Sequence, residues 1–453
     1  MKILIAGCGQ VGLALAQELS AEGHDLTLMD ADPRVLEVGI ERYDVIAVQG
    51  NCASMKTLHQ ADVEKADLLI ACTGSDELNL LACATAHLIN PRIHAIARVR
   101  NPEYAAQAFE MRDAFGLSMT FNPELQAAVE IERLLKMPGF LMRETFAKGR
   151  VEIVEILVDE SSKLRDVSLS MLYGILKCRV LVCAVLRDGR NITPDGQFVL
   201  HQGDRVFVTA PSDNLAMLLK NLGIVTHKVR RALIVGGGML SYYLAQRLES
   251  SSIDVTIMES NEARCMELAA LLPNANVIHG NARADGLPEG EELSEADAFV
   301  ALTDSDELNM VLSLYANQKK LSQVVTRLEQ LGSMGITQHL PLGSVICPRH
   351  LCCSNIVRYV RAMQNQAGAA ITIHSFADGQ AEALEFLVDQ NARFCGTPLK
   401  KLKLRPNILL VGITSKNGIE IPSGDSVYHI GDSVVVVSGG DAVIGQFNDI
   451  FAP

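Results

Sequence analysis

The fold of this chain is indicated by its first residues, Lys2-Ile-Leu-Ile-Ala-Gly-Cys-Gly-Gln-Val-Gly12. An apolar run is followed by Gly-x-Gly-x-x-Gly and then by apolar residues at helical spacing, which predicts a buried strand, a tight turn and a helix. A second apolar run, residues 25–30, predicts a strand that ends in an acid, Asp30. This order of elements is the dinucleotide-binding fingerprint of a parallel, Rossmann-like sheet.

Each glycine of the fingerprint has its own mechanical role. Gly7 permits the turn out of the strand, Gly9 lets the backbone approach a pyrophosphate, and Gly12 lets the helix pack closely on the sheet. The start of the helix then presents unpaired amides to phosphates. Asp30 can accept hydrogen bonds from ribose hydroxyls, and its charge repels the extra phosphate of NADP, which favours NAD(H) or another adenosine nucleotide. The alternative is a glycine turn with a structural role only.

Length and composition indicate a folded protein with several domains. A chain of 453 residues is too long for one core, and ordinary domain sizes predict three or four. Apolar residues make up 48% of the chain and charged residues 21%, which is ordinary for a soluble protein. The net charge of −13 argues against a nucleic-acid-binding protein and against adhesion to anionic lipid by charge alone.

The expected location follows from what the sequence lacks. No apolar run approaches the roughly 18 residues that a membrane-spanning helix needs, and the first strand begins at residue 2, which leaves no room for a signal peptide. The eleven cysteines include no Cys-x-x-Cys pair and are typical of reduced thiols in a cytosolic protein. We expect a cytoplasmic protein, or one that reaches a membrane only through a partner.

Strands alternate with helices in the first part of the chain, which predicts a doubly wound parallel sheet. A helix is expected from Asn122 until Met137-Pro138-Gly139 ends it. Beyond it, short apolar runs separated by turns predict a small α+β module. Its expected strands are residues 151–158, 179–186, 198–200 and 205–209.

The sequence then repeats at an offset of about 229 residues, as from Gly7 to Gly236, Asp30 to Glu259 and Gly189 to Gly418. Such a constant offset indicates a duplication of the whole unit. The predicted domains are a Rossmann-like domain (1–122), a connecting helix (123–148), a small domain (149–228), a second Rossmann-like domain (229–346), a second connecting helix (347–366) and a second small domain (367–453).

The two expected nucleotide sites differ. In the second copy Gly236 and Gly238 are kept, but Ser241 stands at the position of the third glycine and Glu259 at that of Asp30. Asp304 stands where the first copy has Gly74, and a carboxylate beside a phosphate is repulsive. We therefore expect a second site that binds more weakly or selects a different ligand.

The paired Ser-Asp-Glu-Leu-Asn segments, residues 75–79 and 305–309, together with the fingerprint, Asp30, Arg98 and the tandem layout, resemble one family. It is the TrkA family, the cytoplasmic regulatory subunits of bacterial Trk potassium-uptake systems, each built of two RCK (regulator of potassium conductance) units. The resemblance covers essentially the whole chain.

The resemblance implies binding without turnover, so no enzyme is expected. Similar proteins bind NAD(H) or ATP and ADP, and assemble as a homo-oligomer, expected to be a tetrameric ring. The ring lies on the cytoplasmic side of the inner membrane under a channel subunit of the TrkH or TrkG type, whose potassium flux it alters. By resemblance, the cofactor-binding residues of the first copy are Gly7, Cys8, Gly9, Gln10, Val11, Gly12, Asp30, Thr73, Gly74 and Arg98. Those of the second copy are Gly236, Gly237, Gly238, Met239, Leu240, Glu259, Thr303, Asp304 and Arg327.

The rival function is an NAD-dependent oxidoreductase, which would need a positioned acid or base beside the cofactor. His201 and His429 are the candidates, but each precedes a Gly-Asp turn and is more typical of a surface turn. The cluster of residues 347–353, with three cysteines and His350, could ligate a metal, although its spacing matches no standard zinc pattern and favours the start of a packed helix.

Two charged segments can each be interpreted as structural or as functional. Asp304, Asp306 and Glu307 could bind a divalent cation, but solvated acids at a helix start are the simpler interpretation. The basic run of residues 400–403 favours a solvated turn over a membrane contact.

Overall fold

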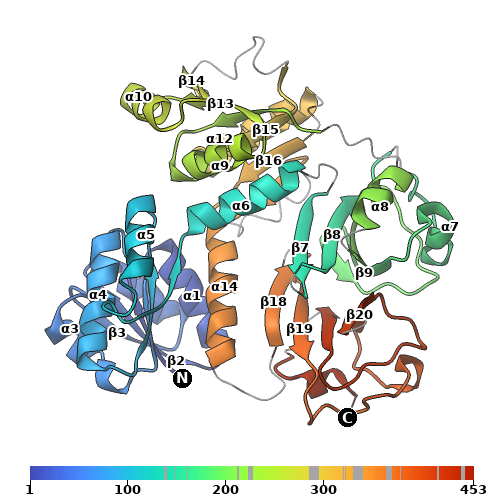
Figure 1. Cartoon of the computed structure of the whole chain (residues 1–453), viewed down its shortest axis with the longest axis horizontal. Coiled ribbons are helices and arrows are strands. Elements are labelled where there is room, and N and C mark those ends of the chain that lie inside the picture. The colour runs from blue at the N-terminus through green and yellow to red at the C-terminus, as the bar shows by residue number, and fades with distance from the viewer. Residues whose placement is uncertain are drawn as a thin grey trace. The chain divides into compact units, whose positions relative to one another are not determined.

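In the computed structural model of the chain (Figure 1) the described residues are 1–136, 140–147, 149–160, 162–211, 214–222, 228–284, 295–319, 321, 323–329, 340–363, 370–377, 379–415, 418–439 and 444–452. They form two six-stranded parallel sheets and two five-stranded antiparallel sheets, in alternation along the chain. The predicted fold class is confirmed. None of the described helices combines the length and the apolar character that crossing a bilayer requires.

The first parallel sheet has the strand order β3-β2-β1-β4-β5-β6 of a doubly wound nucleotide-binding fold. Its strands are β1 (Lys2–Ala6), β2 (Asp25–Asp30), β3 (Val45–Gln49), β4 (Leu68–Ala71), β5 (His94–Arg98) and β6 (Leu117–Phe121). Helices α1 (Gln10–Ala21), α2 (Pro33–Arg42), α3 (Met55–Gln60), α4 (Asp76–Ile89) and α5 (Pro102–Glu110) connect them. The predicted apolar face of α1 is buried through Val11, Leu15 and Leu19.

The second parallel sheet repeats this topology in the order β14-β13-β12-β15-β16-β17. Its strands are β12 (Arg231–Val235), β13 (Asp254–Glu259), β14 (Asn276–His279), β15 (Ala298–Ala301), β16 (Gln323–Arg327) and β17 (Ser344–Ile346). The described helices are α9 (Met239–Ser250), α10 (Glu262–Leu271) and α12 (Asp306–Gln318). The same strand order in both halves confirms the duplication that the sequence predicts.

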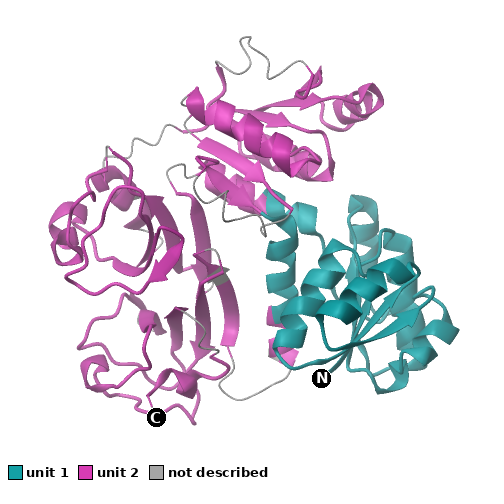
Figure 2. Ribbon diagram, turned by 180° about the vertical axis from the view of Figure 1, so that it is seen from behind, with its two compact units in different colours: residues 1–128, 347–357 teal, residues 129–346, 358–453 magenta. Residues whose placement is uncertain are grey.

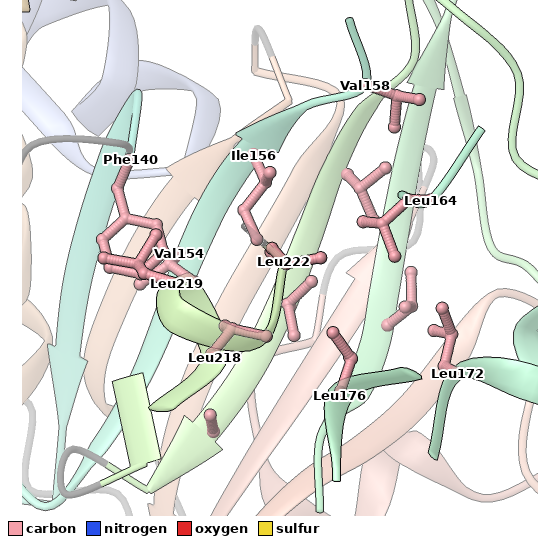
Figure 3. Packing of buried hydrophobic residues seen from close by; sticks show 14 of the residues in the cluster. Phe140, Val154, Ile156, Val158, Leu164, Leu172, Leu176, Leu218, Leu219 and Leu222 are labelled. Carbon is pink, nitrogen blue, oxygen red and sulfur yellow. The ribbon is translucent and has the colours of Figure 1, made fainter. Parts of the chain in front are cut away.

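The small domains are repeated as well. The first has strands β7 (Met142–Phe146), β8 (Val151–Leu157), β9 (Leu181–Arg187), β10 (Arg190–Ile192) and β11 (Arg205–Pro211), with helices α7 (Leu172–Leu176) and α8 (Leu215–Leu222). The second has β18 (Ala370–Phe376), β19 (Ala381–Leu387), β20 (Ile408–Ser415), β21 (Gly418–Glu420) and β22 (Ser433–Gly439). Figure 3 shows the first small core, where α7 and α8 lay apolar side chains such as Leu176 and Leu218 on the sheet.

Two predictions for this region were wrong. The connecting helix expected over 123–148 is α6 (Pro123–Lys136), and residues 142–146 are strand β7, which pairs with β8. The expected strand 198–200 is a single bridge between Ser168 and Val199. The second connecting helix is α14 (Pro348–Met363), and the last residues predicted for it, 364–366, lie outside the described residues.

The two small sheets share one apolar core, although 229 residues separate their equivalent positions. Phe207 and Phe376 lie with ring centroids 4.9 Å apart, one from each sheet. At the edge of this core the side chain of Gln380 accepts from the amide of Asn191 at 3.0 Å and donates to the carbonyl of Gly189 at 2.7 Å. Each sheet therefore covers the apolar face of the other.

The chain has two compact units that do not follow its repeat (Figure 2). One contains residues 1–128 and 347–357, and the other contains residues 129–346 and 358–453. The first Rossmann-like domain thus forms a unit with the beginning of α14, the connecting helix of the other copy. In that helix Cys352, Cys353 and Ile356 are fully buried.

One buried carboxyl group lies where α6 meets the first small sheet. Glu130 is 9% exposed, and its carboxylate is 3.5 Å from the guanidinium of Arg133. Burial, and then the negative charge of Glu144 on β7, raises the pKa of Glu130 to about 8, although Arg133 acts in the opposite direction. Glu144 is itself 2.9 Å from the ring of His374 on β18.

We predict that Glu130→Gln makes the protein less sensitive to pH. An unfolded glutamate releases its proton near pH 4.3, whereas folded Glu130 keeps its proton up to about pH 8. Between about pH 4.3 and pH 8 the folded state therefore binds one more proton than the unfolded state. The contribution of Glu130 to the free energy of unfolding is greatest at low pH and falls as the pH rises towards 8. Thermal midpoints between pH 5 and 8 should fall less steeply for Glu130→Gln than for the wild type. The exposed control Glu110→Gln should keep the wild-type slope, and an unchanged slope for Glu130→Gln would contradict the prediction.

Candidate nucleotide-binding sites

The first glycine loop leaves β1 through Gly7, which has a φ of +95°. Its amide donates to the carbonyl of Met29 on β2 at 2.8 Å. A side chain here would place its Cβ 2.7 Å from the amide nitrogen of Thr73 at the end of β4, so only glycine fits. At Gly12 a Cβ would lie 2.0 Å from the carbonyl oxygen of Gly7, which accounts for the third glycine.

The second glycine of the loop has a different environment. A Cβ at Gly9 would have nothing within 4 Å, and Gly9 and Gln10 are exposed. Gly9 is also the N-cap of α1, and among the described side chains none caps this helix. The start of α1 at Gly9 and Gln10 is therefore exposed at the positive end of the helix dipole, as a phosphate site requires, whereas Val11 and Gly12 are buried.

The acid at the end of β2 lies directly beside this loop. Asp30 accepts a hydrogen bond from the amide of Cys8 at 2.7 Å and another from the amide of Asp32 at 2.9 Å. The side chain remains partly exposed, so its free lone pairs can still accept from a ligand hydroxyl. The thiol of Cys8 points inward, and burial raises its pKa.

The second loop keeps the same backbone contacts with other side chains. Gly236 has a φ of +106° and donates to the carbonyl of Met258 at 2.8 Å. Glu259 accepts from the amide of Gly237 at 2.6 Å and from that of Asn261 at 2.7 Å. Gly238, like Gly9, has open space where a side chain would stand. It is the N-cap of α9, whose first two residues are Met239 and Leu240.

Glutamate at the second acid position requires a change in the loop. A Cβ at Gly237 would lie 2.9 Å from both Cγ and Oε2 of Glu259, whereas the first copy has Cys8 at this position and the shorter Asp30 opposite. The longer acid and the smaller loop residue therefore occur together, and the hydrogen bond between loop amide and carboxylate is kept.

The two candidate sites differ in their charged residues at the ends of the fourth and fifth strands of each sheet. In the first, Arg98 donates to the carbonyl of Thr73, and Arg100 donates to that of Gly74. In the second, Arg327 forms ion pairs with Glu329 at 2.6 Å and with Asp304 at 3.5 Å.

Asp304 and Glu329 stand at the positions of Gly74 and Arg100, so two acids replace a glycine and an arginine. At these strand ends the first copy therefore has a second arginine, which lies 3.7 Å from Asp76, and the second copy has two acids around its arginine. Arg264, which donates to the carbonyl of Gly237 at 2.7 Å, adds a positive charge beside the second loop.

Family models match both halves of this architecture. The model described as the TrkA-N domain matches residues 3–123 and 232–348, which are the two Rossmann-like domains. The model described as the TrkA-C domain matches residues 153–223, within the first small domain. The chain belongs to the TrkA family.

Full-length relatives in this family carry the name of a transport system. The Trk system potassium uptake protein TrkA homolog of Archaeoglobus fulgidus is 31% identical over 451 residues, which cover 100% of both chains. The TrkA protein of Halomonas elongata is 31% identical over 96% of this chain and 95% of its own length. That of Haemophilus influenzae is 28% identical over 100% and 99%.

Solved structures of RCK proteins share the fold. The RCK domain of GsuK superposes with a TM-score of 0.59 at 17% identity, covering 97% of this chain and 92% of that one. The structure described as the GsuK channel bound to NAD gives a TM-score of 0.59 at 17% identity, with 97% and 76% covered. At this identity the comparison concerns the fold alone.

The Ser-Asp-Glu-Leu-Asn segment of this TrkA-family chain is a clamp between the fourth and fifth strands. The hydroxyl of Ser75 caps α4 by accepting from the amide of Leu78 at 3.2 Å. Asn79 is fully buried; its oxygen accepts from the Thr73 amide at 2.8 Å and its nitrogen donates to the Arg98 carbonyl at 3.0 Å.

The second copy repeats the clamp. Asn309 is fully buried and joins the amide of Thr303, at 2.9 Å, to the carbonyl of Arg327, at 3.0 Å. Sequence analysis used both segments as a family signature but assigned no role to either asparagine. The sequence feature that could have indicated this role is an asparagine one turn into the helix that follows the end of the fourth strand.

The acids of these segments only partly match the expectation of solvated helix-start residues. Asp304 is fully exposed, but the carboxylate of Asp306 accepts from the amide of Glu329 at 2.9 Å. Its equivalent Asp76 is buried and accepts from the amides of Arg100 and Asn101, each at 2.8 Å. These two aspartates hold the turn after the fifth strand. Among the described residues, no three His, Cys, Asp or Glu side chains converge as metal ligands would.

The two histidines, the cysteine-rich segment and the basic run have the structural positions that the sequence favoured. His201 and His429 are exposed turn residues whose amides donate to Asp204 and Asp432, each at 2.8 Å. The cysteine-rich segment 347–353 begins α14. In the basic run, Lys400 is exposed and pairs with Asp425 at 2.5 Å.

We predict that Asn79→Ala and Asn309→Ala each destabilise the protein. Removing the carboxamide leaves a partly buried amide and a partly buried carbonyl without their partner, and each such loss costs about 1–3 kcal/mol. Urea unfolding should show a fall of about 2–4 kcal/mol for each variant. The exposed control Asn391→Ala should change the free energy of unfolding by less than about 0.5 kcal/mol. Wild-type stability in both clamp variants would contradict the assignment.

Proposed function

We propose that this chain is the nucleotide-binding regulatory subunit of a Trk potassium-uptake system. The observation that carries the proposal is the pair of open glycine loops, each with an uncapped helix start and an acid from the next strand. Full-length relatives named as potassium uptake proteins supply the transport context.

The proposed ligands are NAD(H) and the adenine nucleotides ATP and ADP. In the first site the amides after Gly9 bind the phosphates, Asp30 accepts from the ribose, and Arg98 and the Thr73-Gly74 turn line the far end. The GsuK channel, which shares the fold, is described as bound to NAD, and this supports a dinucleotide. The proposed second site consists of residues 236–240, Glu259, Thr303, Asp304 and Arg327.

The proposed assembly is a ring of four chains on the cytoplasmic side of the inner membrane, held there by a channel subunit of the TrkH or TrkG type. Exposed apolar side chains on α4 and α5 support self-association, because contact with another chain would remove them from water. Leu88 is 74% exposed, Phe109 is 73% exposed, and Leu81 and its second-copy equivalent Val311 are 55% and 62% exposed.

Gating follows if two nucleotides favour two arrangements of the ring to different extents. A ligand shifts a conformational equilibrium only by its difference in affinity for the two states. Moving a gate from 1% to 99% open needs about 5.5 kcal/mol, whereas one allosteric coupling supplies about 1–3 kcal/mol. Two sites per chain in a ring provide enough couplings to add up to this value.

We predict that Asp30→Ala and Glu259→Ala weaken nucleotide binding at the first and second sites. Each loses a charged hydrogen-bond acceptor worth about 1.5–3 kcal/mol, so affinity should fall about tenfold or more. Calorimetric titration with NAD, NADH, ATP and ADP measures this. Asp25→Ala and Asp254→Ala are matched controls, because these exposed aspartates lie at the opposite ends of the same strands.

Potassium flux through the reconstituted channel complex tests the regulatory part of the proposal. Nucleotides should change the flux with the wild-type chain, and the effect should weaken with Asp30→Ala. A flux indifferent to every nucleotide would overturn it. Oxidation of NADH by the purified protein with a carbonyl substrate would instead support an oxidoreductase.

The two acids beside Arg327 in the second copy, Asp304 and Glu329, lead to a further prediction. Asp304→Asn should strengthen binding of ATP at that site about fivefold, because one unit charge at contact distance in water is worth about 1 kcal/mol. The gain should shrink at high salt. In the first site the reciprocal change Gly74→Asp should weaken ATP binding. Equal ATP affinities in Asp304→Asn and wild type at low salt would contradict the role of this charge.

A further inference from the structure

One peptide group in each glycine loop is held at both of its ends. In the first loop it is the group between Gly7 and Cys8. Its N–H donates to the carboxylate of Asp30 at 2.7 Å, and its carbonyl accepts from the thiol of Cys72 with sulfur and oxygen 3.1 Å apart.

The second loop holds the equivalent peptide group with different residues. The N–H of Gly237 donates to Glu259 at 2.6 Å, and the carbonyl of Gly236 accepts from the hydroxyl of Ser241. Leu302 stands at the position of Cys72 and has no donor, while Ser241 stands at the position of Gly12 and has one. The donor has therefore changed its place in the fold, and the hydrogen bond has been kept.

The geometry explains why a loop has either the cysteine donor or the serine donor. A Cβ at Gly12 would lie 2.0 Å from the carbonyl oxygen of Gly7 and 3.3 Å from the sulfur of Cys72, so the first loop has no room for a serine. In the second loop Ser241 is fully buried and reaches the carbonyl from the helix side. A thiol from the strand end or a hydroxyl from the helix can occupy this place, but not both.

The sulfur of Cys72 is suited to donating a hydrogen bond. Cys72 is 4% exposed, and burial raises the pKa of its thiol to about 12. The group therefore keeps its proton throughout the physiological range.

A peptide group next to a glycine of positive φ needs such support. Glycine reaches many backbone conformations at low cost, so the peptide that follows Gly7 or Gly236 can rotate unless both of its ends are bound. Rotation would turn the N–H away from the acid and alter the direction of the amides that follow it. Those amides are the ones proposed to face phosphate.

We propose that Cys72 and Ser241 are equivalent positioning residues, each of which fixes the first peptide group of its glycine loop and thereby prepares the loop for a nucleotide. Neither residue touches the ligand. The effect on affinity rests on the proposed nucleotide function, whereas the effect on the loop does not.

Hydrogen exchange of the free protein tests the proposal directly. In Cys72→Ala the amide of Cys8, which is hydrogen-bonded to Asp30, should exchange about fivefold faster, because the lost hydrogen bond is worth about 1 kcal/mol. Cys72→Ser restores a donor and should exchange at nearly the wild-type rate. Cys83→Ala is the matched control, since Cys83 is also fully buried in the first domain but its sulfur contacts the Ile96 carbonyl only at 3.9 Å.

The second copy provides an independent test if Cys72→Ala does not fold. Ser241→Ala should raise exchange at the amide of Gly237, which is hydrogen-bonded to Glu259. Ser241→Gly combined with Leu302→Cys, which recreates the arrangement of the first copy, should reduce it again. Titration with NAD and ATP should show about a fivefold to tenfold loss of affinity in Cys72→Ala and recovery in Cys72→Ser.

The outcomes separate this proposal from the proposed function. Unchanged exchange in both alanine variants, or a Cys72→Ser protein that behaves like Cys72→Ala, would overturn the positioning role. Faster loop exchange in a protein that binds no nucleotide, even as wild type, would support the positioning role and overturn nucleotide binding.

Discussion

The backbone of each glycine loop runs against the end of the neighbouring strand with no space for a side chain. A Cβ at Gly7 would lie 2.7 Å from the amide of Thr73, and one at Gly236 would lie 2.6 Å from the carbonyl oxygen of Leu302. This contact joins three parts of the sheet at one place: the end of the first strand, the acid of the second and the asparagine clamp of the fourth and fifth. If the loop were farther away, the acid could not reach its amide, and the start of the helix would face a different direction.

The duplication shows which features of this arrangement are required. The positive φ of the first glycine, the amide-to-acid hydrogen bond, the buried asparagine and the capping serine occur in both copies. The side chains around them differ in compensating pairs: a longer acid accompanies a smaller loop residue, and a helix serine replaces a strand cysteine. The backbone geometry is thus kept while the charged side chains beside the loop differ between the two copies.

The small domains obey a different constraint. Each five-stranded sheet has one face on its own core, as in Figure 3, and a second apolar face that neither domain can bury alone. The two faces meet in one shared core through Phe207 and Phe376. Both small domains and the second Rossmann-like domain therefore belong to one compact unit.

Local patterns were sufficient for the two parallel sheets, because apolar runs and glycine turns depend on residues close together in the sequence, and the constant offset showed that the same pattern occurs twice. The fingerprint alone brought Gly7, Gly12 and Asp30 to one place, since all parallel strands end at the same edge. The sequence could not reveal strand β7, the clamp made by Asn79, the thiol bond from Cys72 or the shared core. Each of these depends on partners from 5 to more than 200 residues away, and only the packed structure decides which buried polar group or apolar face meets which.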